Sequence, residues 1–522
     1  MIPSLGLRTP LRLAAAVATA LLACTLPGAV SGQQRGGTVV VAQAANPPTL
    51  DGMATAAEAA RNITMHIYET LYAYSETIAP IPQLAEGVAI SDDGLSYVFT
   101  LRQGVRFHNG KEMTARDVRA SIERYRRVGA TKSLLAPVES VEVTGDHEVT
   151  LRLSARTPMF LEAFASPRAP VVIIPEEDAA AEVGRISMVG TGPYRLVEYV
   201  PDSHVRLARF EDYAEDTRYA GSDGFGGRKA PHFDEVVFRI MPDPGAQVAA
   251  LEAGEVHVLE RIGVPSGRRL AGSDAIVVHE NMPWAFTVLI FNTAAGPGAN
   301  RDFREAVQAA LNMEEIMAIV GEGLFDLNHR WQYRGSTYDP GEVGRDRYNR
   351  SDLARTAELL ARAGYAGEEV ILVTDTASQQ NIRTAVVAEQ QLRAAGINVV
   401  IRQFDQPTVL ELRRRPEGWH LTTGQMGAAP YFGPVDTLAT MTGAQPLFLA
   451  PDPQIDALFR ELANGPTVEA RQETFRRAQA YLYESFPIIK IGDWGKMEAT
   501  RSNVRGYVPF RIPRMYNVWF EQ

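Results

Sequence analysis

The large apolar residues Tyr97, Phe99 and Leu101 recur at every second position, which predicts a strand. A Gln-Gly turn then leads into a second short strand, predicted over 105–107. After an Asn-Gly turn, a capping-box-like start predicts a helix from Thr114 to about Tyr125. Val118 and Ile122 give that helix one apolar face. This stretch is a strand–turn–strand–helix unit.

The same periodicities predict elements along the rest of the chain. Helical spacing covers 62–74, and one long helix is expected over 301–320. A strand over 370–374, a helix over 378–395 and a strand over 398–404 form a β-α-β pattern, which predicts a right-handed crossover and a parallel sheet. We therefore expect a mixed α/β protein.

Size and composition then limit the class of protein. A chain of 522 residues exceeds one ordinary core, so two or three domains are expected. Its 45% hydrophobic and 22% charged residues are typical of a soluble globular protein. The net charge of −10, with no basic run longer than Arg413–Arg415, argues against a nucleic-acid surface.

The N-terminus has the pattern of a secretory signal. Two arginines precede an apolar run over 13–26, and small residues follow at 29–31 where a signal peptidase cleaves. We expect a signal peptide over residues 1–32 and a periplasmic mature protein. In the alternative interpretation, Cys24 ends a lipobox and anchors the protein to lipid. In both cases the mature domains carry no disulfide or thiol chemistry, since Cys24 is the only cysteine.

The sequence carries no assembled catalytic motif. G-x-S-x-G, H-E-x-x-H and a cysteine nucleophile are missing, and the nine histidines are scattered. The Gly-Thr-Gly at 190–192 has no phosphate-loop spacing. We predict no enzyme, no cofactor and no protein-only metal site. A secreted hydrolase with acids or a Ser/His pair brought together only by the fold stays open as an alternative.

Four segments resemble one family. They are YVFTLRQGVRFHNGKEMTARDV (97–118), GTGPY (190–194), PDPGAQVAALEAGEVHV (242–258) and FNT…GPGANRDFREAVQAALNMEEI (291–316). Together they resemble family 5 of the extracytoplasmic solute-binding proteins, which supply peptide, nickel and related ABC importers. The resemblance implies a periplasmic-binding-protein-like fold of two α/β lobes with a hinge. It also implies a monomer that captures a small solute by lobe closure and delivers it to the importer's membrane permease.

The resemblance also implies a domain order. The first lobe is expected over 33–275, with an extra α+β subdomain inserted at about 52–175. The second lobe is expected over 276–485, and residues 486–522 are expected to return to the first lobe.

Ligand residues are expected where the family binds its solutes. Arg168 resembles an arginine that faces the ligand in nickel-binding relatives, and a guanidinium can pair with a carboxylate in bidentate fashion. Asn46 lies in an N-P-x-x-L-D loop that the family places beside the cleft, while Asn292 and Trp494 lie near the lobe crossovers. Each has an ordinary alternative, as an exposed loop residue or as part of the core.

The segment 424–436 is expected to set the specificity. Peptide-binding relatives carry an aspartate there that pairs with the peptide α-ammonium, but this chain has Ala428-Ala429. Ala429-Pro430-Tyr431 is closer to the nickel-binding relatives, although Met426 replaces their tryptophan. The expected cleft residues are Gln425, Met426, Gly427, Tyr431 and Phe432. We expect a peptide-like or carboxylate-bearing solute, with a metal chelate or an oligosaccharide as the alternatives.

Overall fold

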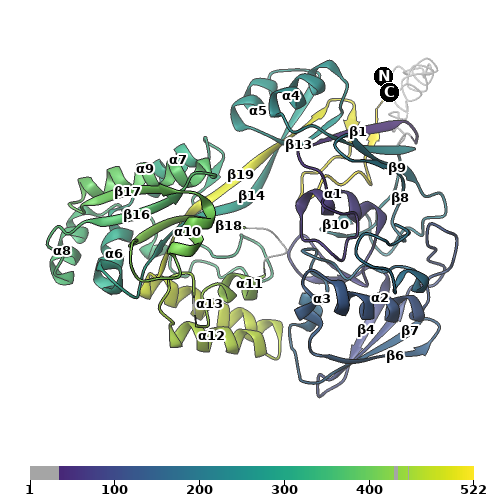
Figure 1. Ribbon diagram of the computed structural model, residues 1–522, viewed down its shortest axis with the longest axis horizontal. Helices are drawn as coiled ribbons and strands as arrows, with labels where there is room; N and C mark the ends of the chain where they lie inside the picture. The colour runs from purple at the N-terminus through teal and green to yellow at the C-terminus, as the bar shows by residue number, and fades with distance from the viewer. Residues whose placement is uncertain (1–34, 428–432, 445, 522) are drawn as a thin grey trace, which may run out of the picture.

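The computed structural model describes residues 35–427, 433–444 and 446–521. A mixed sheet runs through the whole molecule and joins its two lobes (Figure 1). In spatial order its strands are β17 (Val399–Phe404), β16 (Val370–Asp375), β18 (Leu421–Gly427), β14 (Ile276–Phe291), β19 (Ile488–Arg501), β13 (Val258–Ile262), β1 (Thr38–Gln43), β12 (Glu235–Ile240), β9 (His204–Arg209) and β8 (Tyr194–Val200), and β15 (Phe325–Asp326) pairs with β19.

The two longest strands connect the lobes. β14 and β19 pair antiparallel from Ile276 opposite Arg501 to Ile290 opposite Ile488, with register shifts near the middle. We call the elements before β14 and the tail after β19 the first lobe, and the elements between these strands the second lobe. On β14, Ile276 packs in a first-lobe core and Leu289 in a second-lobe core. On β19, Ala499 and Ile491 do the same, so each strand belongs to both lobes.

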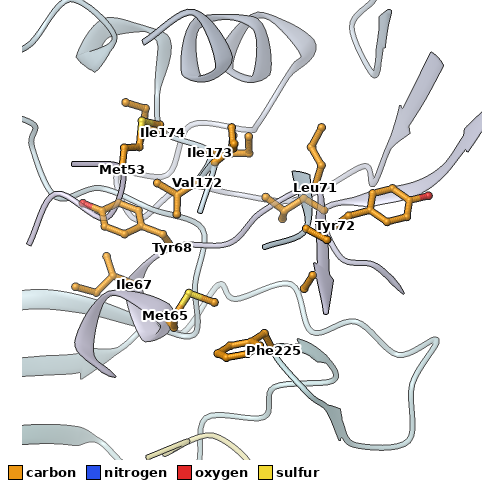
Figure 2. Packing of buried hydrophobic residues seen from close by; sticks show 14 of the residues in the cluster. Met53, Met65, Ile67, Tyr68, Leu71, Tyr72, Val172, Ile173, Ile174 and Phe225 are labelled. Carbon is orange, nitrogen blue, oxygen red and sulfur yellow. The ribbon is translucent and has the colours of Figure 1, made fainter. Parts of the chain in front are cut away.

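The first lobe is built on parallel pairing of β1 with both β12 and β13. Its main core gathers Tyr68, Val172 and Phe225 with many other buried side chains (Figure 2). The helices of this lobe are α1 (Glu58–Ile67), α2 (Ala115–Val128), α3 (Phe160–Phe164), α4 (Pro244–Ala253) and α5 (Val264–Leu270). Its short strands are β2 (Tyr72–Tyr74), β3 (Pro80–Pro82), β10 (Ser222–Asp223), β11 (Gly226–Gly227), β20 (Val504–Arg505) and β21 (Trp519–Phe520).

A separate four-stranded antiparallel sheet lies beside this core. Its order is β4 (Ala85–Ile90), β5 (Ser96–Leu101), β7 (Glu148–Leu153) and β6 (Val138–Gly145). The strand expected at 97–101 is confirmed as β5, and the helix expected from Thr114 is confirmed as α2, with its capping box to Asp117. The strand expected at 105–107 is wrong, because that segment makes only one isolated bridge, from Arg106 to Glu112.

The second lobe confirms the β-α-β prediction, since β16 and β17 pair in parallel around α9 (Gln379–Ala394). The single helix expected over 301–320 is wrong. It is divided into α6 (Arg301–Ala310) and α7 (Met313–Val320), because Asn312 is extended and its side chain caps α7 at the amide of Glu315. The remaining helices are α8 (Leu353–Ala363), α10 (Gln406–Leu412), α11 (Pro434–Ala439), α12 (Pro453–Asn464) and α13 (Val468–Ser485).

The helix expected over 62–74 is also wrong, because α1 ends at Ile67 and the chain continues into β2. The Gly-Thr-Gly segment explains part of this arrangement. Gly192 donates its amide to the carbonyl of Ile67 at 2.9 Å, and a Cβ at Gly190 or Gly192 would overlap the last carbonyls of α1. These glycines therefore allow close backbone packing.

Within the described ranges, no helix has both the length and the apolar character needed to cross a membrane.

Candidate ligand-binding site

A cavity of about 260 Å³ lies between the lobes. Most of its wall comes from the first lobe, around α3 and the end of β2, while Gly433 at the start of α11 comes from the second lobe. The described residues that line it are Tyr74, Thr131, Ser133, Leu134, Met159, Glu162, Ala163, Ser166, Arg168 and Gly433. Apolar side chains and a few polar groups thus share the wall, as is usual for small-molecule sites.

Arg168 lies on this cavity, in the loop that follows α3. The loop is fixed by its neighbours: Ala165 and Ala169 are buried, and the hydroxyl of Tyr125 on α2 donates to the carbonyl of Ala169. Arg168 itself is exposed, and its amide donates to the hydroxyl of Ser166 at 3.4 Å. A rigid loop therefore presents a guanidinium at the rim of a partly apolar cavity, which suits a solute with a carboxylate and an apolar body.

Glu162 brings a negative charge to the same wall. Its carboxylate accepts from Nη2 of Arg471, on α13 of the second lobe, at 2.5 Å. Sequence reasoning missed both residues. One signal was available for Glu162: an acid within the otherwise apolar FLEAF turn is expected to be buried and paired. No local pattern identifies Arg471 as its partner.

Gln425 and Trp494 contact one another at the end of β18. The indole Nε1 of Trp494 donates to Oε1 of Gln425 at 2.7 Å, and Thr287 donates to the same oxygen at 3.1 Å. Nε2 of Gln425 donates to Asn381 at 2.9 Å, and Asn381 donates in turn to Asp375. This chain of bonds fixes the strand end that precedes residues 428–432.

Met426 and Gly427 take the next two positions of β18. Met426 pairs with Phe286 on β14 and packs against a core cluster of the second lobe. Gly427 borders a space of about 10 Å³ with Phe286, Trp331 and Lys490, room for no more than about one water molecule. The expected cleft residues Tyr431 and Phe432, like Ala428 to Pro430, lie outside the described residues.

Asn46 and Asn292 do not border the 260 Å³ cavity. Asn46 binds the β8–β9 turn, where its side chain exchanges two hydrogen bonds with Asp202. Asn292 is fully buried and donates to the carbonyls of Pro416 and Trp419 at 2.8 and 3.0 Å. Its Oδ1 accepts the amides of Ala294 and Ala295, so the structure engages this side chain in fixing two loops.

The fold and the inter-lobe cavity agree with what comparison with known proteins shows. Residues 79–446 match the family described as bacterial extracellular solute-binding proteins, family 5 middle. The chain belongs to family 5 of the solute-binding proteins. Members of family 5 are extracytoplasmic binding proteins rather than enzymes, and this chain is a substrate-binding protein of the ABC-importer class.

Individual family 5 proteins align along nearly the full chain. The probable peptide ABC transporter periplasmic-binding protein y4tO of Sinorhizobium fredii is 26% identical, covering 91% of this chain and 92% of that protein. The substrate-binding protein CtaP of Listeria monocytogenes has a TM-score of 0.80 at 20% identity, covering 94% of this chain and all of CtaP. NikA of Brucella suis, in complex with Fe(III)-EDTA, has a TM-score of 0.78 at 20% identity, covering 93% of this chain and all of NikA.

Proposed function

We propose that this protein captures a small, peptide-like solute with a free carboxylate in the cavity between α3 and α11, and delivers it to the membrane permease of an ABC importer. The observation that carries the proposal is the position of Arg168 on the same inter-lobe cavity as Gly433. Gly433 lies within the segment 424–436 that is expected to set the specificity, directly after the expected cleft residue Phe432.

The chemistry of the wall supports this class of solute. Leu134, Met159 and Tyr74 offer apolar contacts, and Arg168 offers a cation that can pair with a carboxylate. The volume of about 260 Å³ lies at the small end of ligand cavities, which favours a compact solute over a long peptide. Ala428-Ala429 provides no acid for a free α-ammonium, so we expect N-blocked or non-standard peptides to bind better than simple dipeptides.

The remaining expectations belong to the same proposal. We infer cleavage of residues 1–32 and a periplasmic monomer, with the first lobe over 33–275 and 486–522, its inserted subdomain at about 52–175, and the second lobe over 276–485. β14 and β19 begin next to these boundaries, which supports the division.

A metal chelate is the second candidate. The likeness of fold to NikA bound to Fe(III)-EDTA favours it, because EDTA presents several carboxylates to its binding protein. Ala429-Pro430-Tyr431 also resembles the nickel-binding relatives. Both candidates assign the same role to Arg168.

A thermal-shift screen tests the proposal. The mature chain is first unfolded and refolded to remove any bound solute, then heated with dipeptides, N-acetyl dipeptides, opines, Fe(III)-EDTA and sugars. A solute at 100 times its Kd stabilises the folded state by about 2.7 kcal/mol. We expect strong stabilisation by carboxylates and weaker stabilisation by the matching amides. Stabilisation by sugars alone, or by amides as strongly as by acids, contradicts the proposal.

A further inference from the structure

Glu162 and Arg471 join the two lobes through charge. The residues are 309 positions apart, and Nη2 of Arg471 lies 2.5 Å from Oε1 of Glu162. Only 10% of the Glu162 side chain and 5% of the Arg471 side chain is exposed. In Figure 1 the α12–α13 pair reaches toward α3 from the second lobe. The pair can exist only while these surfaces are in contact, so opening the lobes must separate it.

The second lobe orients Arg471 by itself. Nε donates to the hydroxyl of the buried Tyr338 at 3.0 Å, and Nη1 donates to the carbonyl of Gly465 at 3.1 Å. Gly465 also leaves room for the arginine stem, since a Cβ there would lie 2.5 Å from its Cγ. The guanidinium therefore points at the first lobe with two of its nitrogens already bonded, and closure costs it little further ordering.

Glu162 also lines the proposed ligand cavity, together with Arg168. An unpaired carboxylate on this wall would repel a solute carboxylate and offset the attraction of Arg168. When Arg471 binds Glu162, this negative charge is neutralised from outside the cavity. The cavity is then selective for carboxylates only in the closed arrangement.

A further contact joins the lobes at Thr77 and Thr337. The carbonyl of Thr77, at the tip of the β2–β3 hairpin, accepts the amide and the hydroxyl of Thr337 at 2.8 and 2.7 Å. Within the second lobe, Nε2 of Gln472, the residue after Arg471, donates to the carbonyl of Thr337. The ion pair is thus part of a continuous line of contact from the hairpin to α3.

We propose that Arg471 is a specificity-determining residue that couples lobe closure to the preference for a carboxylate. Closure places Arg471 on Glu162, which both stabilises the closed lobes and neutralises the carboxylate of Glu162 on the cavity wall that Arg168 also lines. The preference for a carboxylate rests on the proposed function; the stabilisation of the closed lobes does not.

Closure is measured on the ligand-free mature chain by electron–electron double resonance. Spin labels are placed on Ser154→Cys and Asn464→Cys, two exposed positions on opposite lobes. Cys24 lies in the predicted signal peptide, so no native cysteine competes for label. The variants are Arg471→Gln, Glu162→Gln and their combination. The matched control is Arg477→Gln, on the same helix, whose ion pair with Glu461 is about half exposed.

We expect each single variant to lower the closed-to-open ratio by at least about tenfold, because one buried partner is left unpaired. The double variant should be no more open than either single variant, and Arg477→Gln should match the wild type. Circular dichroism confirms that each variant is folded. An unchanged distance distribution in Arg471→Gln, a wild-type chain with no closed population, or an equal shift in Arg477→Gln overturns the proposal.

The charge effect is measured with N-acetyl-Ala-Ala and its C-terminal amide as probes, by calorimetry at millimolar concentration. Arg471→Gln should weaken the acid by at least about tenfold more than the amide, and adding Glu162→Gln should restore the acid. Equal losses of affinity for the acid and for the amide refute the effect of charge on specificity. They do not contradict the stabilisation of the closed lobes by the ion pair. If the acid does not bind the wild-type chain, both the effect of charge on specificity and the proposed function are wrong. The stabilisation of the closed lobes is then decided by the distance distributions alone.

Discussion

Asp51 and Arg124 form a fully buried ion pair in the first lobe, and we predict that breaking it destabilises the fold. Nη2 of Arg124 lies 2.6 Å from Oδ2 of Asp51, and Nη1 lies 3.1 Å from Oδ1; both side chains are 0% exposed. Asp51 also accepts the amides of Met53 and Gly184. The pair thus ties the loop after β1 to α2.

The perturbation is Asp51→Asn, which keeps the shape of the side chain and removes its charge. Arg124 then stays buried, with the carbonyls of Ala181 and Glu182 as its other oxygen partners within 3.5 Å. Removing one partner of a buried ion pair costs about 3–5 kcal/mol, because the other charge is left uncompensated. That is a large part of the ~5–15 kcal/mol by which a domain is usually stable.

The assay is guanidinium unfolding of the mature chain, followed by fluorescence and circular dichroism. Where the lobes unfold in separate steps, each transition is fitted by itself. The control is Arg152→Gln, which breaks an exposed pair with Glu142 and should cost less than about 1 kcal/mol. Asp51→Leu combined with Arg124→Met should recover much of the lost stability, since it removes both charges.

Two results would refute this reasoning. A loss of less than about 1 kcal/mol in Asp51→Asn would show that the charge of Arg124 is still compensated after the ion pair is broken. Unchanged stability together with lost solute binding would instead place Asp51 in the ligand site, as a loop of the N-P-x-x-L-D kind permits. We expect Asp51→Asn, while folded, to bind solute as the wild type does.

Three further changes test the packing and the site. Gly192→Ala should destabilise the first lobe by about 1–3 kcal/mol, seen as a lower midpoint of unfolding, because its Cβ would overlap the carbonyl of His66; an unchanged midpoint contradicts this packing. Burial lowers the pKa of His66 to about 4, so below pH 6.5 the unfolded chain binds a proton that the folded chain does not. The free energy of unfolding should therefore fall by about 1.4 kcal/mol per pH unit from pH 6.5 toward 4. His66→Gln should reduce this slope in unfolding curves. An equal slope in that variant rules His66 out as a contributor. Gln425→Leu should cost about 1–3 kcal/mol, measured by denaturant unfolding, because it leaves the indole N–H of Trp494 and neighbouring groups unpaired, and a neutral effect contradicts the network.

Local periodicity predicted much of the fold, because it reports which face of an element is buried. β5 and α2 are amphipathic, β16 is almost entirely buried, and Ser378 caps α9 at its start; these elements are all confirmed. The failures have physical causes. Residues 62–74 are buried on nearly every side, so their spacing could not separate helix from strand. The break between α6 and α7 had a signal, Asn312 three residues before Glu315, that helical spacing outweighed.

The site was less accessible from the sequence. Resemblance pointed to Arg168, and the structure places it on an inter-lobe cavity. Glu162 and Arg471 could not be paired by any local rule, because they meet only through the assembly of two lobes. Gln425 and Trp494 carry polar groups suited to a ligand, yet the structure shows these groups bonded to each other. Which polar groups stay available to a solute depends on tertiary contacts.

Calorimetric titration of Arg168→Ala with the carboxylate that stabilises the wild type most, and with its amide, tests directly whether Arg168 binds the solute. The control is Arg116→Ala, an exposed arginine on α2. A hydrogen bond to a charged group contributes about 1.5–3 kcal/mol, so we expect Arg168→Ala to bind the acid at least about tenfold more weakly and the amide with unchanged affinity. If the wild type binds the acid and Arg168→Ala binds it with unchanged affinity, Arg168 is not a ligand residue.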